Sequence, residues 1–155
     1  MKVKSYRDLI AWQKAIELVV EIYKSTASFP RDEQFGLTSQ LRRASVSIPS
    51  NVAEGQGRKS RGEFLQFLGI ARGSLYEVQT QVHVSQKLGL VSEAGALALM
   101  EKTDELGRRF ARQTIMSGIL QGTPGAGGAM GGEKWDPVKG KFGSFNAELL
   151  HEMAL

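Results

Sequence analysis

Apolar residues recur at helical spacing in four separate stretches of the first part of the chain, and no stretch alternates in the manner of a half-buried strand. Two of the stretches open on capping-box patterns, Ser5 with Asp8 and Ser60 with Glu63. The connections are short, which places consecutive helices antiparallel. The sequence therefore predicts an all-α fold, an antiparallel up-down four-helix bundle over residues 1–120.

The four helices are expected to begin near Ser5, Asp32, Ser60 and Ser92, with Gly89 ending the third. Side chains at three- and four-residue spacing are expected to form the apolar faces. In chain order they are Leu9, Trp12, Ile16, Val19, Val20, Tyr23, Phe35, Leu41, Ala44, Val46, Ile48, Val52, Phe64, Phe67, Leu68, Ala71, Leu75, Val78, Val82, Leu88, Leu97, Met100, Leu106, Phe110 and Ile115.

Proline and glycine add local constraints. Pro49 lies inside the second helix and is expected to kink it, with nearby polar side chains bonding the freed carbonyls or, alternatively, opening a polar pocket. These side chains are Ser47, Ser50 and Asn51. The third helix carries glycines that either allow close approach of another backbone, within the bundle or from a second subunit, or are tolerated at the surface. They are Gly62, Gly69 and Gly73.

Composition narrows the class of protein. The chain has no cysteine, which excludes disulfides and thiolate metal sites. No apolar run reaches the roughly 18 residues that span a bilayer, and the first residues lack the apolar core of a signal peptide. A cytoplasmic protein without membrane contact is expected. The net charge of +4 and the isoelectric point of about 9.5 permit binding to nucleic acid without requiring it.

The chain changes character near residue 120. Residues 121–132 are rich in glycine and are predicted to be a flexible linker. Residues 133–155 contain a short amphipathic pattern after Ser144, predicted to dock as a helix on the bundle, on a neighbouring subunit or on another protein, with a disordered end as the alternative. The docking candidates are Trp135, Phe142, Phe145, Leu149, Leu150 and Met153. Of these, Trp135 and Phe142 are expected to dock as irregular chain. This tail is either natural or appended through an engineered linker, and the linker composition favours the second origin.

The basic residues form the strongest functional signal. Residues 1–120 hold 17 basic and 12 acidic residues, a net charge of +5, whereas the tail has a net charge of −1. Arginine makes bidentate contacts with phosphate. The candidates for nucleic-acid binding are Arg42, Arg43, Arg58, Lys59, Arg61, Arg72, Arg108, Arg109 and Arg112. The alternative is a solvated surface with salt bridges, for which Glu105 and Arg109 have favourable spacing. Since no aromatic residues interleave with the cluster, backbone contact without base stacking is expected.

The stretches 6–23 and 29–81 and the Lys-Leu-Gly-Leu turn at 87–90 resemble the bacterial four-helix bundle proteins, also known as intervening-sequence proteins of large-subunit ribosomal RNA. The accessory variability determinant of diversity-generating retroelements shares this fold. The resemblance covers roughly residues 4–118 and is most specific over 40–57. It implies a ring-like homopentamer without catalytic activity, with nucleic-acid binding in the retroelement member. The tail lies outside the resemblance.

Catalytic and metal-binding patterns find little support. His151 begins like a zinc-protease motif, but the second histidine is absent. His83 is expected to be a packed or interfacial residue rather than a metal ligand. The Gly-Gln-Gly at 55–57 is predicted to be a hinge and follows no strand, so it is no phosphate loop, and Glu54 before it is expected to pair with an arginine. No enzyme activity, catalytic residue, metal or cofactor is predicted.

Two functional hypotheses follow. The first is a non-catalytic homo-oligomer that binds the RNA or DNA backbone through its arginine clusters. The second is an oligomeric scaffold or peptide-binding module, in which the C-terminal segment docks on the bundle or on a partner protein.

Overall fold

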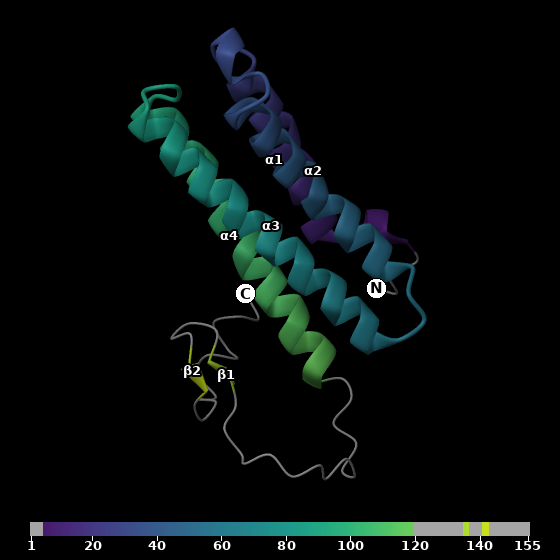
Figure 1. Ribbon diagram of the computed structural model, residues 1–155. Coiled ribbons are helices and arrows are strands. Elements are labelled where there is room, and N and C mark those ends of the chain that lie inside the picture. Colours follow the sequence, from purple (N-terminus) through teal and green to yellow (C-terminus); the bar gives the residue numbers. More distant parts are fainter. Residues whose placement is uncertain (1–4, 120–134, 137–140, 143–155) are drawn as a thin grey trace. The chain divides into compact units, whose positions relative to one another are not determined.

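Four α-helices follow one another along the first part of the chain in the computed structural model of the protein (Figure 1). The structure describes residues 5–119, 135–136 and 141–142, with side chains for residues 5–115. The helices are α1 (Ile10–Thr26), α2 (Leu37–Gln56), α3 (Arg61–Lys87) and α4 (Glu93–Ile119). Short 3-10 turns precede the first two, η1 (Tyr6–Asp8) and η2 (Arg31–Glu33). The predicted all-α helical bundle is confirmed.

The first two helices begin later than predicted. Ser5 forms the expected capping box with Asp8, but it caps η1, and the extended backbone of Leu9 separates that turn from α1. Residue 32 lies in η2, and the α-helix starts only at Leu37. There the carboxylate of Glu33 accepts a hydrogen bond from the Leu37 amide at 3.0 Å. The side chain of Glu33, rather than that of Asp32, thus caps the start of α2.

The ends of the last two helices agree with the prediction. Ser60 and Glu63 form a reciprocal capping box at the start of α3. Gly89 has φ +74° beyond its end, a conformation that glycine adopts without a steric penalty. The hydroxyl of Ser92 accepts a hydrogen bond from the Gly95 amide at 3.1 Å and begins α4. These boundaries are therefore set by local interactions, namely two side-chain caps and the backbone conformation of one glycine.

The core takes one face from each helix, and on α1 this face differs from the predicted one. The buried residues of α1 include the small Ala11 and Ala15 beside Leu18 and Ile22. Of the predicted face, Ile16, Val20 and Tyr23 are largely exposed, and Trp12 is half-buried. The prediction followed the large apolar residues of the helix. The core of α1 instead includes two alanines, because small side chains allow neighbouring helices to approach most closely. The remaining core residues are Leu9, Leu41, Ala44, Ile48, Val52, Leu68, Ala71, Leu75, Val78, Val82, Ala96, Leu99, Leu106 and Phe110.

Four further residues predicted to be buried are exposed. Phe35 precedes α2 rather than lying within it, and 89% of its surface is accessible. Val46 lies on the outer face of α2, and Leu88 lies beyond the end of α3. On α4, the buried Ala96 and Leu99 flank Leu97, which points out of the core. In each case the position on the helix, rather than the apolar character, decides the burial.

The packing of α2 on α3 is close near their connection. A Cβ atom built on Gly55 would lie 2.8 Å from the Cβ of Phe67, so only glycine fits there. Gly55 is therefore a buried contact in the last turn of α2, which corrects the prediction of a hinge at this residue. Further along, the hydroxyls of Ser47 and Ser74 join the two helices at 2.9 Å.

Pro49 is accommodated inside α2, which runs without interruption from Leu37 to Gln56. The polar side chains beside it bond within the helix. The Ser50 hydroxyl donates to the Val46 carbonyl at 2.8 Å, and the Asn51 amide donates to the Ser47 carbonyl at 2.8 Å. The carbonyl that Pro49 leaves without an amide donor is that of Ser45, four residues earlier, and neither of these bonds reaches it, so they do not confirm that the polar side chains satisfy the freed carbonyl. Ser47 also lines a hollow beside α2.

The glycines of α3 leave space instead of filling it. At Gly62, Gly69 and Gly73, a Cβ atom would meet no described atom within 4 Å. The predicted close approach within the bundle is therefore wrong for these three residues, and their face of α3 stays open.

The chain falls into two units, Met1–Phe110 and Ala111–Leu155, so the division lies within α4, ahead of the predicted linker. In the second unit, β1 (Trp135–Asp136) pairs antiparallel with β2 (Lys141–Phe142), and Trp135 lies opposite Phe142. A strand pair thus stands where irregular chain was predicted. In the described part of the chain, none of the helices combines the length and the apolarity needed to cross a membrane.

Candidate nucleic-acid interface

Arg42 and Arg43 are adjacent on α2 but have different surroundings. The Nε of Arg42 donates a hydrogen bond to the Thr26 hydroxyl at 2.9 Å. Its guanidinium carbon lies 4.5 Å from the ring centroid of Tyr23, a cation–π contact. Arg42 is therefore held against α1. Arg43 is exposed and forms no ion pair among residues 5–115.

The connection between α2 and α3 carries Arg58 and Lys59, and Arg61 begins α3. Arg58 pairs with Glu54, as predicted for that carboxylate, and its guanidinium lies 4.7 Å from the ring centroid of Phe67. Lys59 is exposed, and Arg61 is half-buried with an enclosed Nε that has no hydrogen-bond partner among the described residues. Lys59 and Arg61 thus have no carboxylate partner within the bundle.

The capping box fixes the direction in which this connection enters α3. The Glu63 amide donates to the Ser60 hydroxyl at 3.2 Å, and the Ser60 hydroxyl donates to the Glu63 carboxylate at 2.7 Å. The hydrogen bond from the Ser60 hydroxyl, and after it the one that the Ser60 amide donates to the same carboxylate at 3.3 Å, hold the pKa of Glu63 below its ordinary value of 4.5. The carboxylate stays ionised and engaged at neutral pH, so it does not pair with the neighbouring cations.

The structure separates the predicted arginines into distinct places. Arg42 and Arg43 lie in the early turns of α2, whereas Arg58 follows its C-terminal end, about 20 Å away at 1.5 Å per residue. Arg72 is exposed on α3. The interface is therefore a set of separated positive sites rather than a single cluster.

On α4, Arg109 is already occupied. Its Nη2 lies 2.8 Å from the Glu105 carboxylate, which confirms the salt bridge expected from the spacing. The hydrogen bond from Arg109 lowers the pKa of Glu105. The pKa of Lys14 on α1 is raised, first by its hydrogen bond to Glu17 and then by the charge of Glu105. Arg108 is exposed without an ion pair among residues 5–115, and Arg112, also exposed, belongs to the second unit.

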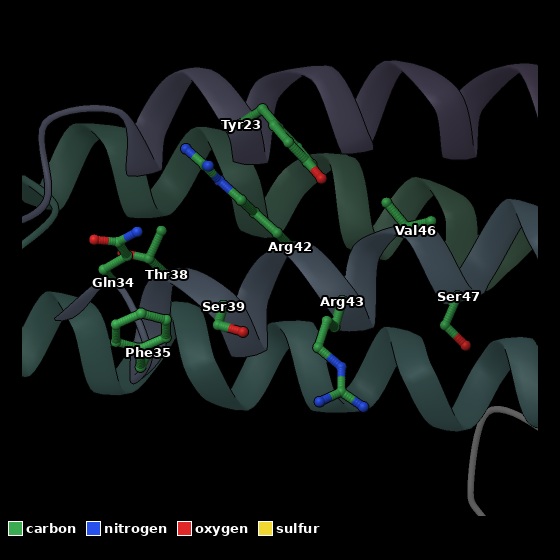
Figure 2. A pocket seen from close by; sticks show the side chains of 9 residues that line it. All are labelled: Tyr23, Gln34, Phe35, Thr38, Ser39, Arg42, Arg43, Val46 and Ser47. Atoms are coloured by element: carbon green, nitrogen blue, oxygen red, sulfur yellow. The ribbon is translucent and has the colours of Figure 1, made fainter.

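A hollow of about 620 Å³ adjoins the first pair of arginines (Figure 2). Tyr23, Phe35, Arg42 and Arg43 are among its lining residues. The sequence assigned Tyr23 and Phe35 to the core, and therefore missed that aromatic rings accompany these arginines. A signal was available: the Phe-Gly pair at 35–36 follows a run of polar residues, where a helix start exposes its flanking side chain.

In the described part of the chain, no group of three or more His, Asp or Glu residues is placed to hold a metal ion. His83 is exposed on α3 and is therefore not packed in the bundle core, while a place between subunits stays a prediction. His151 lies outside the described residues, as do the docking candidates Phe145, Leu149, Leu150 and Met153, and the linker 121–132.

The comparisons with known proteins bear on fold and family. Residues 7–112 match the family model described as the 23S rRNA-intervening sequence protein. The fold is similar to that of a protein of unknown function from the S23 ribosomal protein family of Bacteroides thetaiotaomicron VPI-5482. The two share 19% identity at a TM-score of 0.58, over 72% of this chain and 99% of the other. No curated protein sequence matches the chain. Since the family model spans most of the chain and all but the end of the bundle, the chain belongs to the 23S rRNA-intervening sequence protein family.

Proposed function

We propose that the protein is a non-catalytic accessory protein that binds nucleic acid, with RNA preferred over DNA. Binding occurs through contacts between its arginines and the phosphate backbone. One observation carries the proposal. Seven of the nine predicted cations have no carboxylate partner among residues 5–115. They are Arg42, Arg43, Lys59, Arg61, Arg72, Arg108 and Arg112. Cations without a carboxylate partner are free to replace the counterions of a phosphate backbone.

The family supports RNA as the partner. Its description associates it with an intervening sequence of ribosomal RNA. The separated positions of the arginines favour contact along a backbone over recognition of one compact ligand. Such binding is weak at each site and depends strongly on salt. DNA of the same length is the comparison that tests the preference for RNA.

We further propose that the protein assembles as a homo-oligomer, with the ring-like pentamer as the expected form. Large apolar side chains lie exposed on two faces of the bundle. On α1 they include Ile16 and Val20, and on α3 they include Ile70 and Tyr76, beside the open glycines. Burying such surfaces against a second copy would remove them from water. Repetition of weak sites around a ring raises their combined affinity.

The test is a triple variant, Arg58→Ala with Lys59→Ala and Arg61→Ala. It is expected to weaken binding to a mixed-sequence RNA and to flatten the dependence of affinity on salt, since each phosphate contact contributes about one unit of slope. The matched control removes three positive charges elsewhere, at Lys14, Lys24 and Lys87. Equal affinity and equal salt slope for the wild type and the arginine variant would refute the proposal for this site.

A second candidate function, an oligomeric scaffold, is favoured by the same exposed apolar faces. In this case the C-terminal segment docks on a partner, and nucleic acid plays no part. Deletion of residues 122–155 is then expected to abolish partner binding while the assembly of the bundle persists. A truncated protein that keeps every interaction of the full chain would exclude the scaffold function.

A further inference from the structure

The hollow between α1 and α2 has the size of a small-ligand site. Its volume of about 620 Å³ falls within the ~300–1,000 Å³ that such sites span. A second hollow of about 340 Å³ shares Gln34, Thr38 and Arg42 with it. The two hollows therefore adjoin at the start of α2. Together they have room for more than one chemical group of a ligand.

The charge of this surface favours an anion. Arg42 and Arg43 line the first hollow, Arg31 lines the second, and no carboxylate lines either one. Two acids, Asp32 and Glu33, lie between the lining residues Arg31 and Gln34 in sequence, and Glu33 already accepts the hydrogen bond from the Leu37 amide at the start of α2. The guanidinium of Arg43 has no ion pair among residues 5–115.

Aromatic rings stand beside these charges. Phe35 is 89% exposed and lies in the turn between η2 and α2. Figure 2 shows Phe35 and Ser39 among the lining residues and the Arg42 side chain reaching toward Tyr23 of α1. Tyr23 is 44% exposed and already carries the Arg42 guanidinium on its ring. Phe35 lines the same hollow as Arg42 and Arg43, and an exposed aromatic ring is a surface on which an unpaired base stacks.

We propose that this hollow binds an unpaired nucleotide of single-stranded RNA, with the base stacked on Phe35 and the phosphate on Arg43. This inference rests on the proposed nucleic-acid function and names its substrate class. The polar side chains of Gln34 and Ser39 lie in the same lining and are placed to bond base edges. A base within a duplex cannot stack on the ring, because its faces are covered by its neighbours. Arg31 lies on the path of the following phosphate.

The test compares binding of a uridine RNA about 12 nucleotides long, within the site sizes of single-strand binders, with binding of a duplex of equal length. Phe35→Ala is expected to weaken binding to the single strand about fivefold or more and to leave duplex binding and the salt slope unchanged. Phe35→Trp is expected to retain single-strand binding, because indole also stacks. Leu97→Ala removes a comparably exposed apolar side chain on α4 and serves as the control.

The outcomes separate this inference from the function on which it rests. If Phe35→Ala binds the single strand as the wild type does, while the arginine triple variant loses affinity, the stacking site is refuted and the proposed function stands. If the wild type binds neither RNA, both fall. A loss of equal size for single strand and duplex refutes stacking. A reduced mass of Phe35→Ala by light scattering would identify the ring as a subunit contact and overturn the proposal.

Discussion

Gly55 of α2 lies directly against Phe67 of α3, so closely that a Cβ atom on the glycine would be 2.8 Å from the Cβ of the phenylalanine. The Cβ of Phe67 is fixed by its own backbone, so rotation of a side chain alone does not relieve the crowding. The contact sets the distance between α2 and α3 beside the connection that carries Arg58 and Lys59.

We expect Gly55→Ala to destabilise the bundle by about 1–2 kcal/mol. Overpacking typically costs about 1–3 kcal/mol, and the higher helix propensity of alanine returns up to about 1 kcal/mol. Urea unfolding followed by circular dichroism measures the change. An unchanged or raised midpoint would show that α2 and α3 can separate at this point without loss.

The open glycines of α3 predict the opposite behaviour. The double variant Gly69→Ala with Gly73→Ala meets no described atom, so we expect the bundle to gain up to about 1 kcal/mol per position from helix propensity. We also expect its assembly to weaken, since the methyl groups stand where we place the neighbouring subunit. Light scattering over a range of protein concentrations tests this. A variant that keeps the wild-type mass would move the subunit contact to another face.

Phe110 and Leu97 were predicted on the same apolar face of the fourth helix, yet only one of them is buried. Phe110 is 1% exposed and Leu97 is 61% exposed. Phe110→Ala is expected to cost about 3–5 kcal/mol, because it leaves a cavity, whereas Leu97→Ala is expected to change stability by less than about 0.5 kcal/mol. Thermal unfolding of the two variants measures the difference. Similar losses for both would place Leu97 in a contact between subunits.

The capping box at Ser60 and Glu63 predicts a dependence of stability on pH. The folded-state pKa of Glu63 is lowered, so its contribution is complete above the unfolded value of 4.5 and is lost as the pH falls through the folded value. Glu63→Gln keeps a capping side chain but does not titrate. Urea midpoints measured from neutral pH down to about pH 3 should therefore fall less steeply for this variant than for the wild type. Parallel curves would mean that the carboxylate contributes nothing at this position.

The sequence was sufficient to predict the helices whose ends are set by neighbouring residues. Ser60 and Glu63 act on each other across one turn, and Gly89 needs only its own backbone freedom. The start of α2 was misplaced because it depends on the carboxylate of Glu33 reaching the Leu37 amide, a contact with no sequence pattern of its own.

The candidate site was predicted less well than the fold. The arginines were identified as residue types, but their grouping depends on the length of α2, which separates Arg43 from Arg58. The aromatic rings were missed because an apolar residue at helical spacing is usually buried. The choice of Ala15 over Ile16 for the core turns α1 so that Tyr23 faces outward. Which face of α1 is buried depends on its packing against the neighbouring helices, so it cannot be predicted from the sequence of α1 alone.

The short connections between consecutive helices have a consequence for the speed of folding. Contacts join α1 to α2 and α2 to α3, and most native contacts join residues close in sequence; helical proteins of low contact order fold in microseconds to milliseconds. In the homo-oligomer that we propose, a bundle that is complete on this timescale exists before its copies meet by diffusion. Assembly would then join finished subunits, and its rate would rise with protein concentration while the rate of helix formation stays constant.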